Sequence, residues 1–187
     1  MLDTRQNNSV NGIDVAALGA VANAVAGDPA QGKVAFEVTT RWVGQTRSET
    51  VVDGFALAGK TIPRSHRILV DEPCQLLGED RAANPQEMLM AAVNACLVVG
   101  YVAGAAVRGI KLNRLEIHTR GELDMRGFLG LGEDVPPGYQ SLDYEVRIGG
   151  DGSPDQFEEI HQAVIRTSPN YFNISRPVPV NATLNVD

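Results

Sequence analysis

The sequence predicts an α+β domain in which a largely antiparallel sheet packs on two main helices. Two observations lead to this prediction. Residues 84–109 form a long apolar segment with the start signals of a helix, and several shorter segments alternate between apolar and polar residues, as half-buried strands do. The 187 residues, 43% of them hydrophobic, are enough to bury one core. We divide the chain into a polar tail with an appended helix, residues 1–31, and a main domain, residues 32–187.

The first part of the chain is predicted to hold one helix followed by strands. The expected elements are a short helix over residues 11–26 and strands over residues 33–43, 46–53 and 64–71. Gly44 and Gln45 are expected to form a two-residue turn. This turn places Arg47 opposite Trp42 on the apolar face of the hairpin. A shift of register by one residue would move Arg47 to the other face.

The second part of the chain is predicted to continue the sheet and to add a second main helix. The expected elements are a strand over residues 111–123, a long loop over 124–139, a strand over 142–148, a helix over 153–168 and a strand over 177–186. Pro169 ends the helix. Two prolines make the last strand an edge segment. Of the histidines here, His118 is expected to be exposed on a strand and His161 to lie near the edge of the apolar helix face.

The segment 84–109 organises the rest of the chain. Asn84 can cap a helix, Pro85 suits the first helical position, and Glu87 can reach back to the amide of the cap. No charge follows between residues 88 and 107, and apolar residues cover every face, so the helix must be surrounded. About twenty such residues could also span a bilayer. The many small residues and the absence of a basic cluster favour a buried central helix without a membrane.

Composition excludes several classes of function. The net charge of −7 argues against a nucleic-acid binder, which needs a basic face. The two cysteines, Cys74 and Cys96, form no CxxC pair and no pairing with histidine, so we expect neither a metal nor a cofactor. Two unpaired cysteines fit a reducing compartment, and a cytoplasmic location is therefore expected.

Cys96 is the candidate nucleophile, because it lies in the middle of the apolar helix. A cysteine reacts as the thiolate, which needs a stabilising environment. Cys96 is twelve residues past Asn84, beyond the reach of the helix dipole, and Glu87 falls on the opposite side of the helix. An activating cation must therefore come from elsewhere in the chain or from a second chain. The alternative is a buried cysteine that serves only packing.

A set of short motifs resembles the OsmC/Ohr family of thiol-dependent peroxidases, and more closely its less characterised OsmC-like branch. The resemblance covers residues 33–187. The matching residues are Asn84-Pro85-x-Glu87-Met88-Leu89, Ala91-Ala92, Ala95-Cys96, Trp42-Val43-Gly44, Arg126-Gly127-Phe128-Leu129-Gly130 and Ser168-Pro169 leading into Pro177-Val178.

The resemblance implies a fold, an assembly and a set of site residues. It implies an intertwined homodimer whose central helices are buried at the interface, with two active sites between the chains. It also implies that Cys96 is the peroxidatic thiol, that an arginine of the first hairpin stabilises the thiolate, and that a glutamate near the helix start orients this arginine. Arg47 is the first match for the arginine and Arg41 the second, and Glu87 is the nearest glutamate.

The sequence departs from the family pattern at three places. Gln86 stands where the true hydroperoxide resistance enzymes have the glutamate, directly after the Asn-Pro pair. The first hairpin lacks a clear Gly-Gly-Arg match. Ser168 stands where the resolving cysteine is expected, so a disulfide within the chain is not available to Cys96 there.

Three hypotheses follow. The first is a peroxidase that reduces organic or hydrogen peroxide through Cys96 alone, with an external thiol as reductant of the sulfenic acid. The second is a non-catalytic protein of the same fold that binds a small hydrophobic or thiol ligand at the dimer interface. The third is acyl or thioester transfer at Cys96, for which the sequence offers no Cys-His pairing. The first is favoured.

Overall fold

The computed structural model describes residues 9–186 and shows an α+β chain with antiparallel strand pairs, which confirms the predicted fold class. The strands divide among separate sheets and do not form one continuous sheet. The chain falls into two compact units, Met1–Ala91 and Ala92–Asp187. We describe each unit by itself.

The first unit begins with a small hairpin and a helix and continues into a sheet. Its elements are β1 (Ser9–Val10), β2 (Ile13–Asp14), α1 (Val15–Gly27), the 3-10 turn η2 (Pro29–Gly32), β3 (Val34–Phe36), β4 (Thr39–Gly44), β5 (Arg47–Leu57), β6 (Lys60–Val70) and the 3-10 turn η3 (Cys74–Leu76). The helix predicted over residues 11–26 begins later than expected. Asp14 is its cap, because the Asp14 side chain accepts a hydrogen bond from the Ala17 amide.

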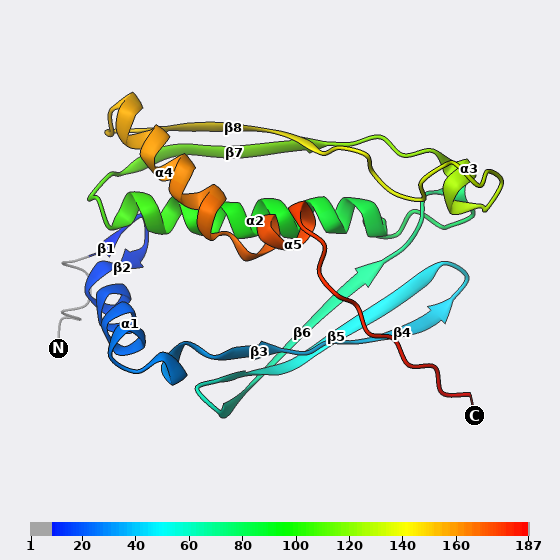
Figure 1. The fold of residues 1–187 in the computed structure, drawn as a ribbon, viewed down its shortest axis with the longest axis horizontal. Coiled ribbons are helices and arrows are strands. Elements are labelled where there is room, and N and C mark those ends of the chain that lie inside the picture. The colour runs from blue at the N-terminus through cyan, green and yellow to red at the C-terminus, as the bar shows by residue number, and fades with distance from the viewer. Residues whose placement is uncertain (1–8, 187) are drawn as a thin grey trace. The chain divides into compact units, whose positions relative to one another are not determined.

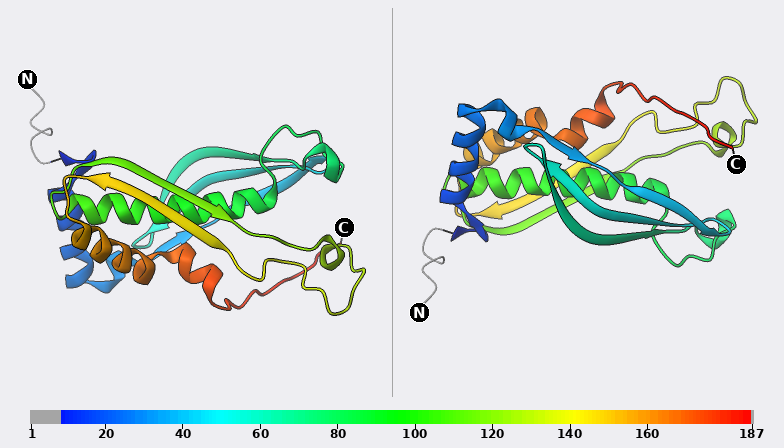
Figure 2. Two further views of the ribbon diagram at one scale, coloured as in Figure 1. Left: turned by 90° about the horizontal axis from the view of Figure 1, so that it is seen from above. Right: turned by 90° about the horizontal axis from the view of Figure 1, so that it is seen from below.

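Strand β5 is the centre of the sheet in the first unit. It pairs with β6 along its length, while β3 and β4 share its other edge, so the strand predicted over residues 33–43 is interrupted at residues 37–38. Both β5 and β6 are longer than predicted, and they form the long ribbon in Figure 2. Their turn at Ala58 and Gly59 has positive φ at both residues, the geometry of a tight hairpin turn.

The register of the first hairpin differs from the prediction by one residue. Ser48 lies opposite Trp42, and Arg47 lies opposite Gly44, with an irregularity between Trp42 and Gly44. The expected pairing of Arg47 with Trp42 was therefore wrong, because one extra residue on β4 shifts the pairing. The Trp42 indole donates to the Gln45 carbonyl over 2.8 Å and closes the tip of the hairpin.

The second unit packs an antiparallel strand pair on two helices, as predicted. Helix α2 (Pro85–Ala106) begins in the first unit and forms the centre of the second. Its other elements are β7 (Leu112–Arg120), α3 (Met125–Phe128), β8 (Asp143–Gly150), α4 (Pro154–Thr167) and α5 (Pro169–Ser175). In Figure 1, β7 and β8 run side by side along α2. The buried core consists of Val93, Leu97, Tyr101, Ala105, Ile110, Ile160 and Val164.

Two features near the C-terminus differ from the prediction. Pro169 ends α4 as expected, but it also starts the short helix α5, which the prediction missed. Residues 177–186 form no strand within this chain. Two of these residues, Pro177 and Pro179, lack the amide donor that a strand ladder needs. The apolar side chains of this segment are exposed, namely Val178, Val180, Leu184 and Val186.

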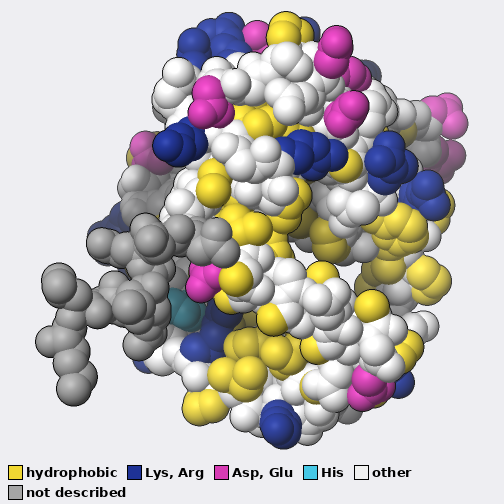
Figure 3. Space-filling model, turned by 90° about the vertical axis from the view of Figure 1, so that its left-hand side faces the viewer, with side chains coloured by type: hydrophobic (Ala, Val, Ile, Leu, Met, Phe, Trp, Pro, Cys, Tyr) yellow, Lys and Arg dark blue, Asp and Glu magenta, His cyan; other side chains and the backbone are white. Residues whose placement is uncertain are grey.

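Helix α2 is apolar but only partly covered within one chain. Among the described residues it is the one helix that is long and apolar enough to cross a membrane, and 22% of its most apolar window is buried. Length and composition alone are weak evidence for a membrane span, since the core helix of a soluble protein meets the same criteria. Exposed hydrophobic side chains include Leu89 and Val99 of α2 and Val107, which directly follows the helix. Figure 3 shows hydrophobic side chains at the surface in several patches, between polar and charged ones.

The contact between α2 and α4 depends on small residues, which gives a test of the core. A Cβ atom at Gly104 would lie 3.1 Å from Ile160 Cγ2. We expect Gly104→Val to lower the free energy of unfolding by about 1–3 kcal/mol, because overpacking forces the helices apart. Urea denaturation measures this change. The matched control is Gly19→Val in α1, where a Cβ meets nothing within 4 Å. Equal effects of the two substitutions would contradict the predicted close packing.

Candidate functional site

Cys96 lies in the middle of α2 beside a serine of the second unit. Its side chain is half-buried, and the Ser168 hydroxyl donates a hydrogen bond to its sulfur, with 3.3 Å between Oγ and Sγ. Ser168 is only 6% exposed. The two residues are 72 positions apart in the sequence, so the contact exists only because the second unit folds as it does.

The junction between α4 and α5 holds the Ser168 hydroxyl in place. The Ser168 amide donates to the Val164 carbonyl and ends α4, while Ser168 Oγ accepts from the Tyr171 amide and caps α5. One residue into α5, the Asn170 side chain donates to the Ala92 carbonyl over 2.8 Å and ties the junction to α2. The hydroxyl is therefore oriented from both helices.

This arrangement defines what the serine can do for the sulfur. A hydroxyl that donates to a thiolate stabilises the charged form. It contributes no net charge, and it cannot form a disulfide. The Cys96–Ser168 pair therefore offers a thiolate one neutral hydrogen-bond donor at a half-buried cysteine.

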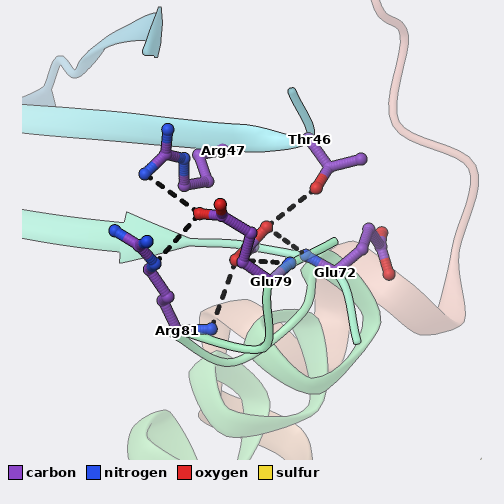
Figure 4. Close-up of polar contacts among 6 residues, drawn as sticks. Thr46, Arg47, Glu72, Glu79 and Arg81 are labelled. Carbon is purple, nitrogen blue, oxygen red and sulfur yellow. Dashed lines mark hydrogen bonds and ion pairs between the residues drawn. The ribbon is translucent and has the colours of Figure 1, made fainter. Parts of the chain in front are cut away.

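Arg47 lies at the start of β5 in the first unit, where it pairs with a glutamate that the sequence analysis did not select. The distance from Arg47 Nη1 to Glu79 Oε2 is 3.2 Å, and Arg81 Nε lies 2.9 Å from the same oxygen. Figure 4 shows both guanidinium groups directed at the Glu79 carboxylate. Arg47 Nε is buried and has no hydrogen-bond partner among the described residues.

Asp71 organises the loop that carries Glu79. Its carboxylate is 1% exposed and accepts four hydrogen bonds, from the Thr46 hydroxyl and from the amides of Glu72, Glu79 and Arg81. Burial acts to raise the pKa of Asp71, but the hydrogen bonds from Thr46 and the amides outweigh it, so the pKa lies below its ordinary value. The tip of the first hairpin and the loop after β6 are thereby tied to one buried carboxylate.

A glycine makes the tight course of this loop possible. A Cβ atom at Gly78 would lie 1.7 Å from the Glu72 carbonyl oxygen, which no side chain can accommodate. The residues on either side of the Gly78–Glu79 pair, Leu77 and Asp80, both have positive φ. The loop therefore has one specific shape, and that shape holds Glu79 next to Arg47.

Glu87, the predicted partner of the arginine, is engaged at the start of α2. Its carboxylate accepts from the Asn84 amide over 2.9 Å, and the Asn84 side chain accepts from the Glu87 amide over 2.8 Å. This is the capping box that the sequence predicts. Arg41 lies on β4 opposite Glu49. The roles predicted for Glu87 and for the two arginines stay predictions.

The sequence analysis missed Asp71 and Glu79 because they carry no motif. The one available signal was an acidic residue directly after the apolar strand end Ile68, Leu69 and Val70. Among the described residues, no group of three or more His, Cys, Asp or Glu side chains is placed to hold a metal ion.

Comparison with known proteins decides the family. The family model described as OsmC-like protein matches residues 78–183, more than half of the chain. The chain belongs to the OsmC family. The matched region of this OsmC-family protein contains Glu87, Cys96 and Ser168, while Arg47 and Arg41 precede it. No curated protein matches the chain.

Solved structures of OsmC-like proteins share the fold. An OsmC-like protein from Mycoplasma pneumoniae is 15% identical with a TM-score of 0.58, over 75% of this chain and 86% of that one. A putative osmotic stress induced and detoxification response protein from Psychrobacter arcticus is 12% identical with a TM-score of 0.55, over 72% and 84%. An OsmC-like protein of unknown function from Vibrio cholerae is 15% identical with a TM-score of 0.51, over 73% and 90%. At these identities the likeness concerns the fold alone.

The lowered pKa of Asp71 predicts a pH-dependent contribution to stability. Because the pKa in the folded state lies below the ordinary value of 3.8, ionised Asp71 stabilises the fold above that pH, and the contribution is lost as the pH falls through the folded-state pKa. We expect Asp71→Asn to lower the melting temperature at pH 7, since an amide cannot accept four hydrogen bonds in the same way. The difference from wild type should shrink below about pH 4.

Thermal denaturation between pH 7 and pH 3 measures this difference. The control is Asp53→Asn on β5, whose side chain is exposed and which we expect to change the melting temperature little. A difference between wild type and Asp71→Asn that stays constant across this range would show that the charge of Asp71 does not matter.

Proposed function

We propose that this OsmC-family protein reduces organic or hydrogen peroxide through Cys96 alone and so acts in defence against peroxide stress. The observation that supports this most is the hydrogen bond from Ser168 Oγ to Cys96 Sγ. Ser168 is the residue at the expected resolving position, and it lies at the sulfur itself. A hydroxyl there can stabilise a thiolate but cannot close a disulfide. Family membership supports the general chemistry.

The proposed reaction has three steps. The Cys96 thiolate attacks one oxygen of the peroxide, an S–O bond forms and the O–O bond breaks, and the leaving oxygen takes a proton to become an alcohol, or water from hydrogen peroxide. The cysteine is thereby oxidised to a sulfenic acid. An external thiol then attacks the sulfenic sulfur and releases water, and a second thiol reduces the resulting mixed disulfide to regenerate the thiolate. A cytoplasmic location, where small thiols are kept reduced, fits this cycle.

Arg47 is our candidate for the positive charge at the thiolate. Its Nη1 is engaged with Glu79, but its Nε is buried without a partner among the described residues. A buried donor without an acceptor is costly, so we expect an acceptor to reach this nitrogen in the working protein. Glu79, rather than Glu87, is the carboxylate we propose to orient the arginine, because it makes the direct contact.

We also propose that the protein works as an intertwined homodimer. Residues 177–186 alternate between apolar and polar side chains, as a strand does, yet they pair with no strand among the described residues. Val180, Leu184 and Val186 are more than four-fifths exposed. Much of α2 is also uncovered although its sequence is apolar. A second copy would cover apolar surface of this kind. The assembly supports the function because the family resemblance implies an active site between two chains.

A non-catalytic role in binding a small hydrophobic or thiol ligand is the alternative. The neutral character of Ser168 favours it, because a hydroxyl adds no charge to stabilise a thiolate. The two functions differ in whether the Cys96 sulfur changes its oxidation state, which a mass measurement detects directly.

We expect the intact protein to gain one oxygen atom rapidly when treated with one equivalent of cumene hydroperoxide or hydrogen peroxide, and to form an adduct when a small thiol is added. Both changes should be absent in Cys96→Ser, since the sulfur is the site of oxidation. Rapid-quench mass spectrometry measures the rate. Cys74→Ser, which removes the exposed cysteine, is the matched control and should react as wild type does.

Oxidation of Cys96 at the rate of free cysteine would overturn the peroxidase proposal and favour the binding role. Equal peroxide consumption by wild type and Cys96→Ser would also exclude this cysteine as the reacting group.

The Ser168 contact predicts that a second cysteine can restore the disulfide cycle. In Ser168→Cys the new thiol would stand next to Cys96, so peroxide treatment should end in the loss of two hydrogen atoms instead of the gain of one oxygen. The sulfur of Ser168→Cys attacks the sulfenic acid and releases water. Ser168→Ala, which keeps the backbone and removes the donor, should gain the oxygen more slowly than wild type, by about fivefold. A sulfenic acid that persists in Ser168→Cys would argue that the two positions do not meet during turnover.

A further inference from the structure

The second unit contains a cavity that the thiol chemistry does not use. Its volume is about 390 Å³, which lies within the range of small-ligand sites. The walls come from the inner face of β8, the first turns of α4 and the middle of α2. Neither Cys96 nor Ser168 lines it. The cavity is therefore a feature separate from the proposed peroxidatic site.

A buried phenol and an imidazole meet at this cavity. Tyr101 of α2 is 1% exposed, and its hydroxyl is hydrogen-bonded to Nδ1 of His161 on α4. The two rings stack with their centroids 6.0 Å apart and an angle of 18° between their planes. Burial raises the pKa of Tyr101, and the negative charges of ionised Tyr144 and of Glu158 would raise it further, so the phenol keeps its proton and can donate it.

The lining has one acidic group and several aromatic faces. Glu158 is the carboxylate, the side chains of Tyr144 and Phe157 supply aromatic surface, and no lysine or arginine is among the described residues that line the cavity. Aromatic faces attract cations, and a carboxylate at the same site pairs with them. An anionic ligand would meet Glu158 with no compensating cation from the described lining residues. A neutral apolar ligand would offer the Glu158 carboxylate no positive charge to pair with.

We propose that this cavity binds a small organic cation, a protonated amine carried on an aromatic body, with Glu158 pairing with the ammonium and the aromatic side chains covering the ring. The Glu158 carboxylate already accepts from Gln162 over 2.8 Å, which fixes its orientation along α4. The site would take its ligand independently of the oxidation state of Cys96. The alternative to a ligand site is that the Tyr101–His161 contact serves only to join α2 to α4.

Binding of phenethylamine to the full chain tests the proposal, with 2-phenylethanol and 3-phenylpropionate as neutral and anionic counterparts of similar shape. We expect saturable binding of the amine, weaker binding of the alcohol and none of the acid, measured by titration calorimetry and by shifts of the His161 imidazole signals in NMR spectra. Glu158→Gln should weaken amine binding about fivefold, since the Glu158 side chain is exposed and its charge is screened by solvent. Glu159→Gln is the matched control, because Glu159 is the neighbouring residue, is also exposed, and is not among the described residues that line the cavity.

Two further results decide the proposal. Cys96→Ser should bind phenethylamine as wild type does, which separates this site from the thiol chemistry. Absence of saturable amine binding, equal binding of the acid and the amine, or equal effects of Glu158→Gln and Glu159→Gln would each overturn the proposal and leave the Tyr101–His161 pair as a structural contact.

Discussion

The rest of the structure depends on the need to cover α2, a helix that has no polar face. Within the second unit, Leu97 and Tyr101 of this helix are almost completely buried against α4 and the β7–β8 pair. Gly100 and Gly104 let α4 approach closely, because any larger residue would meet Val164 or Ile160. Burial of one helix thus fixes where the second helix lies, and with it where the second helix ends.

The position of Ser168 follows from that packing. The end of α4 and the start of α5 fall next to the part of α2 that carries Cys96, and the capping hydrogen bonds of both helices orient the serine hydroxyl. The same contact between α2 and α4 also brings Tyr101 of α2 next to His161 of α4. The packing of α4 on α2 therefore positions two chemically different places. One is a thiol with a neutral hydrogen-bond donor, and the other is an aromatic cavity with a carboxylate.

Local patterns predicted the elements whose signals lie within a few residues. The Asn84–Glu87 capping box, the alternation along β7 and β8, and the end of α4 before Pro169 were all visible in the sequence. Predictions failed where the outcome depends on partners far along the chain. The register of the first hairpin differs from the predicted one by one residue because of an irregularity between Trp42 and Gly44. The residue types there do not predict this irregularity. The segment 177–186 has the alternation of a strand but no partner strand in the part of the chain that the structure describes.

The candidate site shows the same division between local and distant contacts. Cys96 could be selected from its place in the helix motif, and the Ser168 position from the family pattern, and the structure brings these two together. The partner of Arg47 could not be selected, because Glu87 satisfies a local capping box, while Glu79 reaches the arginine only through a loop that Asp71 and Gly78 shape. A carboxylate that caps its own helix gains two short-range hydrogen bonds at little entropic cost. Arg47 therefore pairs with Glu79, an acidic residue whose position depends on tertiary structure. Local spacing in the sequence does not predict an ion pair of this kind.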